Sequence, residues 1–223
     1  MNLEILDICN RRLESDIKII RNSVLQRLSQ IDAIILCGGY GRGEGSWIID
    51  KSTKKVYPYN DYDLYIVTDM KPSSRKISEI ENEISKKVGL KWIDIDTITK
   101  KKLTNLKPSI KNIDLKYASK IIYGDKNILK EIPDINPSNI STLDIEILYF
   151  TRLWTFMGSL SETGFTDLNI EEARFFKNQM AKALLACVDV LLLQNNQYDT
   201  SYIKRLKIAI GLYPEKEWLT NLG

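Results

Sequence analysis

The sequence predicts an α/β (α+β) chain: a small mixed sheet flanked by helices, followed by a C-terminal helical bundle. In the first part, short apolar runs alternate with helical patterns, which is typical of mixed α/β structure. Beyond a stretch rich in Pro, Asn and Ser around Pro133 and Pro137, the patterns are all helical. We therefore expect one domain over residues 1–130 and a helical domain over residues 138–223.

Helical and strand patterns alternate in the first domain. Apolar residues recur at helical spacing in two segments, Leu3–Ser29 and Ser74–Val88. Short apolar or alternating runs predict three strands, at Ala33–Cys37, Asp63–Thr68 and Lys91–Ile98. Two further segments are less regular: Trp47–Tyr59 predicts a hairpin or an ordered loop, and Ile113–Leu129 predicts a helix or a helix followed by a strand.

The second domain shows helical periodicity in three segments, Thr142–Leu160, Ile170–Gln194 and Tyr202–Leu212. Asp189 is an acid inside an apolar helical pattern. A buried ion pair or a polar helix stripe accounts for such a residue, and recognition of a substrate is the alternative.

Composition excludes several kinds of chemistry. The chain has no histidine, which rules out Ser-His-Asp and Cys-His catalysis as well as histidine metal sites. Its three cysteines are far apart and have no metal-site spacing, so we expect buried free thiols. The net charge is +3, too weak an excess to predict a nucleic-acid partner. Acid–base or metal chemistry must therefore rest on carboxylates, Lys, Tyr or Cys.

Neither a signal peptide nor a membrane span is predicted. The N-terminus carries early acids and no small-residue cleavage site. The most apolar stretch, Ala183–Leu193, is too short to cross a bilayer and contains Asp189. We expect a cytoplasmic protein.

A glycine-rich loop, Cys37-Gly-Gly-Tyr-Gly-Arg-Gly-Glu-Gly-Ser46, follows the first predicted strand. Glycine lets a backbone approach a ligand closely, and successive N–H groups in such a loop can bind phosphate oxygens. Arg42 could add a charge-assisted contact to phosphate. The loop is neither a Walker A motif, because no Gly-Lys-Ser/Thr follows, nor a dinucleotide motif, because Gly-x-Gly-x-x-Gly is absent.

Acidic pairs mark the two strands that follow. Asp61 and Asp63 stand two residues apart at the start of a strand, so their side chains share a face. Asp94 and Asp96 repeat the spacing on the third strand. If these strands are neighbours, three or four carboxylates converge. Such a cluster suits a hard divalent cation such as Mg²⁺, as two ions or as one ion with a general base.

Together these elements resemble the DNA polymerase β nucleotidyltransferase superfamily, in which a strand and a Gly-Gly or Gly-Ser turn precede Asp-x-Asp and a later acid. The matching residues are Gly38-Gly39, Asp61-Tyr62-Asp63 and Asp94, and the expanded glycine loop is similar to that of small bacterial members, including antibiotic and minimal nucleotidyltransferases. The resemblance covers about residues 30–125.

The resemblance implies an enzyme that transfers a nucleoside monophosphate from an NTP, such as ATP, to a hydroxyl group and releases pyrophosphate. It implies that Asp61 and Asp63, with Asp94, hold Mg²⁺, expected as two ions, and that Asp94 activates the hydroxyl; Asp96 is the alternative third acid. The implied nucleotide-binding residues are Gly38, Gly39, Gly41, Arg42 and Ser46.

The chain departs from the pattern at two points. The Trp47–Tyr59 segment lengthens the gap before Asp61 and would have to bulge as a hairpin. Gly39 stands where members often have Ser, so its N–H would have to substitute, helped by Ser46 or Arg42.

Two other function classes remain open. One is an antitoxin-like or regulatory nucleotide-binding module without turnover; retention of all three acids favours the enzyme. The other is an RNA-modifying enzyme, which needs a basic stripe that the sequence lacks. The acceptor, a small molecule, sugar or protein, and the oligomeric state are left open.

Overall fold

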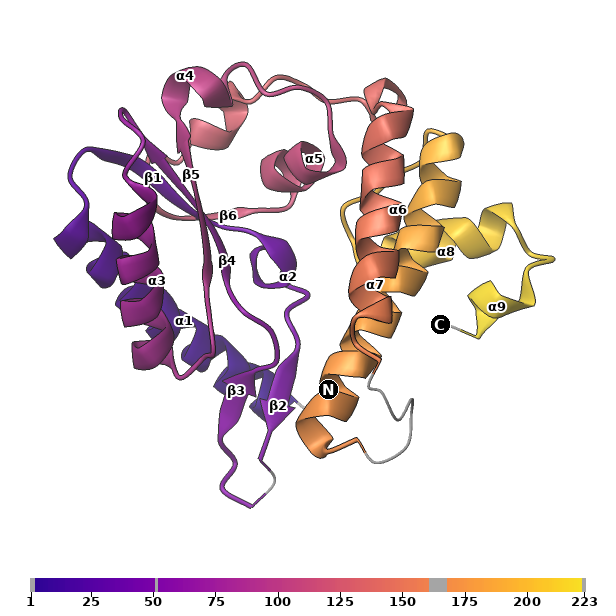
Figure 1. Cartoon of the computed structure of the whole chain (residues 1–223), viewed down its shortest axis with the longest axis horizontal. Helices are drawn as coiled ribbons and strands as arrows, with labels where there is room; N and C mark the ends of the chain where they lie inside the picture. The colour runs from indigo at the N-terminus through magenta and orange to yellow at the C-terminus, as the bar shows by residue number, and fades with distance from the viewer. Residues whose placement is uncertain (1–2, 51, 161–167, 222–223) are drawn as a thin grey trace. The chain divides into compact units, whose positions relative to one another are not determined.

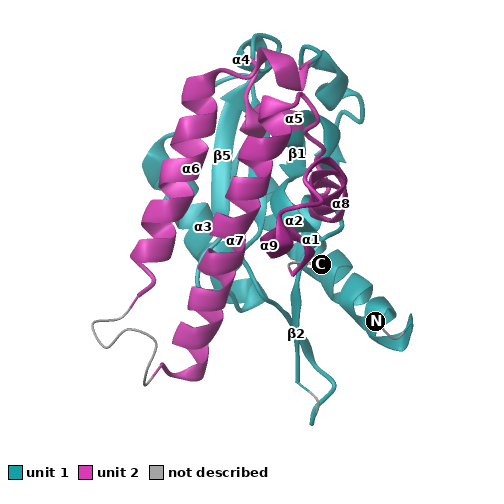
Figure 2. Cartoon of the chain, turned by 90° about the vertical axis from the view of Figure 1, so that its right-hand side faces the viewer, with its two compact units in different colours: residues 1–107, 114–134 teal, residues 108–113, 135–223 magenta. Residues whose placement is uncertain are grey.

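The chain divides into two compact units in a computed structural model that describes residues 3–50, 52–160 and 168–221. Unit 1 comprises residues 1–107 and 114–134, and unit 2 comprises residues 108–113 and 135–223 (Figure 2). The main division follows Asp134, inside the predicted linker, and a second division passes through the helix at residues 110–117.

Unit 1 contains most of the strands and helices expected of the first domain (Figure 1). Its helices are α1 (Leu3–Arg27), α2 (Gly38–Gly41), α3 (Ser74–Val88) and α4 (Lys100–Leu103), with α5 (Ile110–Tyr117) at the division and a 3₁₀ turn, η1 (Ile128–Glu131). Its strands are β1 (Ile31–Leu36), β2 (Trp47–Ile49), β3 (Val56–Pro58), β4 (Asp63–Thr68), β5 (Asp94–Thr99) and β6 (Lys120–Gly124).

The main sheet has four strands in the order β5-β4-β1-β6. β1 runs antiparallel to β4 and β6, whereas β4 and β5 are parallel, so the sheet is mixed. β2 and β3 form a separate antiparallel hairpin, as expected of the long insert. The parallel pair brings the starts of β4 and β5 side by side, which positions the acids that open both strands.

Alternating side chains bury one face of this sheet against α1 and α3. Ile34, Leu64 and Ile66 of the sheet share a core with Ile20 of α1 and Ile80 of α3. Helix α3 begins at the Ser73 cap and ends at Gly89, whose φ of 72° suits the left-handed C-cap that glycine favours. Its buried positions follow the predicted helical stripe.

Unit 2 is helical. It consists of η2 (Pro137–Asn139), α6 (Thr142–Met157), α7 (Ile170–Gln194), α8 (Tyr202–Leu212) and α9 (Glu217–Thr220). A capping box formed by Asn169 and Glu172 fixes the start of α7. The predicted fold class is therefore confirmed: a small mixed sheet with flanking helices, followed by a helical part.

Some details differ from the expected elements. The third strand begins at Asp94 rather than Lys91, and the glycine loop opens with the short helix α2. The ambiguous segment from Ile113 resolves into the end of α5 and the strand β6, separated by a bend at Ala118. No helix in the described ranges is both long and apolar enough to cross a membrane.

A buried ion pair explains the predicted acid in α7. Nη1 of Arg205 donates to both carboxylate oxygens of Asp189 at 3.0 Å, and the side chains are 2% and 7% exposed. The guanidinium also donates to two backbone carbonyls and stacks on the Tyr198 ring, 4.2 Å from its centroid. The pair therefore joins α8 to α7.

Arg205→Met is expected to destabilise unit 2 by about 3–5 kcal/mol, because it leaves the Asp189 carboxylate buried without this partner. Chemical denaturation followed by circular dichroism measures the change. In the matched variant Arg205→Met/Asp189→Leu, which removes the buried charge as well, much of the loss should be recovered. Equal stability of wild type and the single variant would contradict a structural role for the pair.

Candidate functional site

Three carboxylates converge where β4 and β5 begin. Asp61, Asp63 and Asp94 each place one oxygen so that all three atoms lie within 4.8 Å of one another. Asp63 and Asp94 are register partners across the parallel pair, and the Asp94 N–H donates to the Tyr62 carbonyl. Within the described ranges no other set of acids or cysteines has such an arrangement.

Asp96, the alternative third acid, lies farther along β5. Its register partner is Tyr65, two residues beyond Asp63, and it is not part of the cluster. Asp94 is exposed, whereas Asp61 and Asp63 are partly buried. The geometry thus favours Asp94 over Asp96 for the predicted role, which stays a prediction.

Gly38 lies directly against the cluster. Its φ is +61°, and a Cβ added there would stand 1.9 Å from Asp63 Oδ2. The positive φ favours glycine, and any Cβ here would force the Asp63 carboxylate to turn away. The Cys37 N–H donates to the Asp63 carbonyl at 2.8 Å, so the glycine turn and β4 are joined immediately beside the acid. The predicted turn and the predicted metal ligands meet.

The other predicted loop residues have different surroundings. Gly39 faces the backbone of Gly45 at an ordinary contact distance. Gly41 packs on β1: a Cβ there would lie 2.3 Å from the Leu36 carbonyl oxygen. Ser46 is exposed at the base of the hairpin. Contacts of these residues with a nucleotide stay predictions.

Arg42 takes part in ion pairs within unit 1. Its side chain is 5% exposed, with Nη1 3.3 Å from an Asp114 oxygen and Nε 3.5 Å from a Glu44 oxygen. The pair with Asp114 joins the end of the α2 turn to α5. A contact between Arg42 and phosphate stays a prediction, and it would require exchange of an existing carboxylate partner.

Tyr40 joins the glycine loop to the hairpin. Its hydroxyl donates to the Ser46 carbonyl at 2.5 Å and accepts from the Tyr59 N–H at 3.0 Å. The Tyr59 N–H also donates to the Ser46 carbonyl, so the two ends of the insert are closed by one small network. The hairpin therefore leaves and rejoins the chain at one point, so that the glycine loop and Asp61 are joined as they would be by a short connection.

Tyr62 anchors the acidic strand from the opposite face. It stands between the two acids of the Asp-x-Asp pair, so its ring points into the core, where it is fully buried and lies edge-on to Tyr40 at 4.7 Å. Its hydroxyl donates to the buried Asp16 of α1 at 2.8 Å, and Arg12 pairs with the same carboxylate. The acids are thereby tied to a long helix.

Tyr62→Phe is expected to destabilise unit 1 by about 1.5–3 kcal/mol, because it removes a hydrogen bond to a charged group in the core. Urea unfolding of wild type and variant measures the difference. Tyr123→Phe, at a tyrosine that is 37% exposed, is the matched control and should change stability little. Equal losses in both variants would contradict the anchoring role.

The same tyrosine predicts a loss of stability in alkali. Burial, with the Asp16 charge beside it, raises the pKa of Tyr62 far above its usual value. The folded chain therefore keeps a proton that the unfolded chain releases, so this contribution is fully present below about pH 10 and declines above it. Unfolding measured from pH 8 to 11 should show a shallower decline for Tyr62→Phe than for wild type; parallel profiles would contradict it.

The donor set fits a hard divalent cation. Three carboxylates this close repel one another unless a cation lies among them, and oxygen-only ligands suit Mg²⁺. Asp61, Asp63 and Asp94 are the residues that would hold it.

Sequence reasoning missed the tyrosines that support the site. Tyr62 carried a signal, because strand alternation directs it away from the acids on either side. Tyr40 carried none, since its partners Ser46 and Tyr59 are brought together by the hairpin.

No protein-family model matches the sequence, and no curated protein is significantly similar to it. Among solved structures, the chain is similar to spectinomycin adenyltransferase from Enterococcus faecialis with ATP and spectinomycin. The identity is 11% and the TM-score is 0.48, and the similarity covers 94% of this chain and 98% of that one.

Two toxin–antitoxin structures are also similar, one with AMP-PNP at 12% identity and one of an MntA-HpeT mutant at 10%. Each has a TM-score of 0.36 and covers 51% of this chain and 77% of its own.

Proposed function

We propose that the protein is an Mg²⁺-dependent nucleotidyltransferase, which moves a nucleoside monophosphate from an NTP to a hydroxyl group of a small molecule, sugar or protein. The observation that carries the proposal is the meeting of Asp61, Asp63 and Asp94 within 4.8 Å, with Gly38 packed against Asp63. Three converging carboxylates beside a glycine turn suit a metal–triphosphate complex.

In this proposal Asp61 and Asp63 hold Mg²⁺, expected as two ions shared with Asp94 and the triphosphate. The bound metal would supply positive charge that offsets the negative charge developing on the phosphate oxygens. Gly38 lies against Asp63, and in this proposal the backbone N–H groups of the glycine turn would donate to phosphate oxygens.

Asp94 is the proposed proton acceptor. It is the most exposed of the three acids, and its position at the start of β5 leaves it open to an acceptor molecule. The acceptor oxygen forms a bond to the α-phosphorus while the bond to the bridging oxygen breaks and pyrophosphate leaves. The hydroxyl proton passes to Asp94.

The test is release of pyrophosphate from each NTP with Mg²⁺, against a panel of aminoglycosides, sugars and proteins. The proposal expects release that requires both Mg²⁺ and one class of acceptor, and that Asp94→Asn abolishes. Tight Mg²⁺-dependent NTP binding without release from any acceptor would instead support the regulatory, non-catalytic module. Absence of NTP binding would contradict both.

A further inference from the structure

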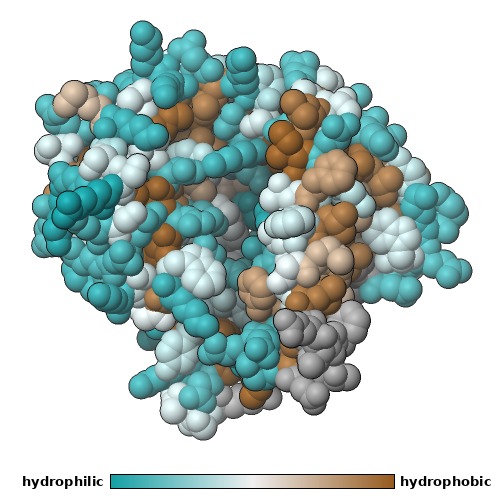
Figure 3. Space-filling view, viewed as in Figure 1, coloured by the Kyte–Doolittle hydropathy of each residue, from teal (hydrophilic) through white to brown (hydrophobic). Residues whose placement is uncertain are grey.

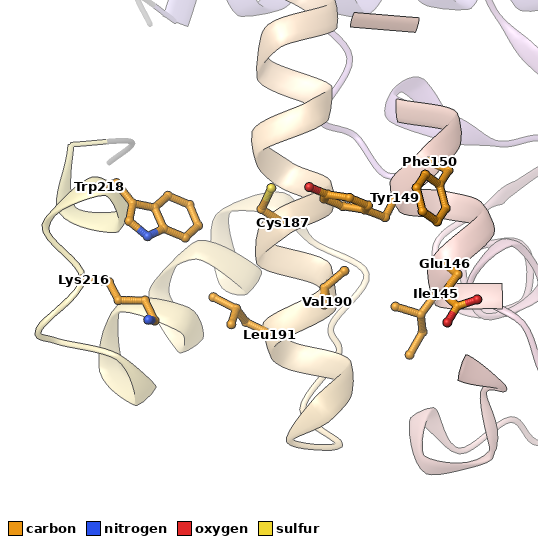
Figure 4. A pocket seen from close by; sticks show the side chains of 9 residues that line it. All are labelled: Ile145, Glu146, Tyr149, Phe150, Cys187, Val190, Leu191, Lys216 and Trp218. Atoms are coloured by element: carbon orange, nitrogen blue, oxygen red, sulfur yellow. The ribbon is translucent and has the colours of Figure 1, made fainter. Parts of the chain in front are cut away.

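A cavity of about 470 Å³ lies within unit 2, between α6, α7 and the α9 segment (Figure 4). A cavity of this size suits a small molecule. All of its lining residues belong to unit 2, so its shape does not involve the acidic site of unit 1.

Most of the lining is apolar. Aromatic rings come from both ends, Tyr149 and Phe150 on α6 and Trp218 on α9, and the middle is formed by aliphatic side chains of α7 including Val190 and Leu191. Tyr149 and Phe150 pack edge-on, with ring centroids 5.9 Å apart. Aromatic rings at both ends and aliphatic side chains between them favour a ligand with an aromatic or branched apolar group.

The α9 end of the cavity is firmly anchored. Leu219, next to Trp218, is fully buried and packs in one cluster with Val188 and Leu192 of α7. These two residues lie on the core side of α7, while Cys187 and Leu191 line the cavity. The wall that carries Trp218 is therefore held by the unit's own core, as a preformed site requires.

Three polar side chains, Lys216, Tyr149 and Glu146, line the cavity. In Figure 4 the Lys216 amine points toward Leu191 and the Tyr149 hydroxyl points toward Cys187, whereas the Glu146 carboxylate lies at the opposite end beside Ile145. The Lys216 amine also lies 5.5 Å from the centroid of the Tyr213 ring, which keeps it at the wall. The lining therefore carries one cation and one anion at opposite ends, and the end with Lys216 favours an anionic group on the ligand.

We propose that this cavity is a binding site for a small apolar carboxylate, whose ring system lies among Tyr149, Phe150 and Trp218 and whose carboxylate pairs with Lys216. The inference is independent of the nucleotidyltransferase proposal.

An exposed apolar surface on α6 is a separate feature. Phe150 and Trp154 of this helix are 63% and 80% exposed, and Figure 3 shows hydrophobic side chains gathered over α6. Trp154 is not part of the cavity lining. Any test must therefore distinguish the cavity from this surface, to which apolar probes also adsorb.

The experiment uses three probes of one shape: naphthylacetate, its neutral amide naphthylacetamide, and the cation naphthylmethylamine, titrated into the full chain by calorimetry. We expect naphthylacetate to bind at least about tenfold more tightly than the cation, since one charge-assisted contact gives a difference of that order. Lys216→Met should remove this preference and leave the amide's affinity unchanged. Lys207→Met, at an exposed lysine of α8, should behave as wild type.

A second measurement locates the probe. Cys187 lines the cavity, whereas Cys9 and Cys37 are buried elsewhere, so naphthylacetate should slow maleimide labelling of Cys187. Burial raises the pKa of the Cys187 thiol, so labelling is expected to be slow even without the probe. Trp154→Ala should leave both measurements unchanged, and Val190→Trp, which fills the cavity, should abolish binding.

Equal affinity for anion and cation, no protection of Cys187, or loss of binding in Trp154→Ala would each overturn the inference. Asp63→Asn separates this inference from the proposed function. It should bind naphthylacetate as wild type does, whatever its effect on nucleotide binding.

Discussion

Asp63→Asn is expected to abolish Mg²⁺-dependent NTP binding while leaving the fold intact. The substitution keeps the shape of the side chain but removes one of the three negative charges that converge within 4.8 Å. Loss of a residue that only orients a metal ligand costs 10- to 100-fold in affinity, so loss of a ligand charge should cost at least about a hundredfold. Calorimetric titration with each NTP, with and without Mg²⁺, measures it.

The sequence offers a matched control for this variant. Asp96→Asn removes an exposed acid from β5, two residues beyond Asp94 and outside the cluster. It should bind Mg²⁺ and NTP as wild type does. Equal losses of binding in Asp63→Asn and Asp96→Asn would instead indicate a general effect of net charge. If Asp96→Asn were impaired and Asp94→Asn were not, the third acid would be reassigned.

Gly38→Ala is expected to lose metal-dependent nucleotide binding with only a modest loss of stability. The added Cβ would lie 1.9 Å from Asp63 Oδ2, so the carboxylate has to turn away. Rotating a carboxylate costs little in folding, but a displacement of about 1 Å in such a site can cost a hundredfold in function. The positive φ adds about 1–2 kcal/mol of strain for alanine.

Gly43→Ala separates the two effects. Gly43 also has a positive φ, +77°, but a Cβ there meets nothing within 4 Å. Both variants should lose similar stability by thermal unfolding, and only Gly38→Ala should lose Mg²⁺-dependent NTP binding. Equal binding by the two variants would show that the contact between residue 38 and Asp63 has no role in the site.

Periodicity was enough to predict most of the fold. Alternation placed Ile93 and Ile95 in the core and their acidic neighbours outside, and the helical stripe of α3 predicted its buried face. The segment from Ile113 was ambiguous because α5 and β6 are both short, and β6 is defined by pairing with the distant strand β1. Such non-local pairing leaves no local pattern.

The acids and the glycine turn could be read from the sequence because each needs a particular residue type at a fixed local spacing. Their mutual distances could not, since the register of Asp63 with Asp94 depends on which strands are neighbours. The hydrogen bond from Tyr62 to Asp16 could not be predicted for the same reason, since the two residues are 46 positions apart in the chain.

Binding of Mn²⁺ tests whether Asp61, Asp63 and Asp94 form a metal site. Mn²⁺ can be followed by electron paramagnetic resonance as a substitute for Mg²⁺, in the presence of a non-hydrolysable NTP analogue. Wild type and Asp96→Asn are predicted to bind Mn²⁺ tightly and to the same extent, and Asp63→Asn is predicted to lose this binding. Equal Mn²⁺ binding by wild type and Asp63→Asn would contradict the metal site.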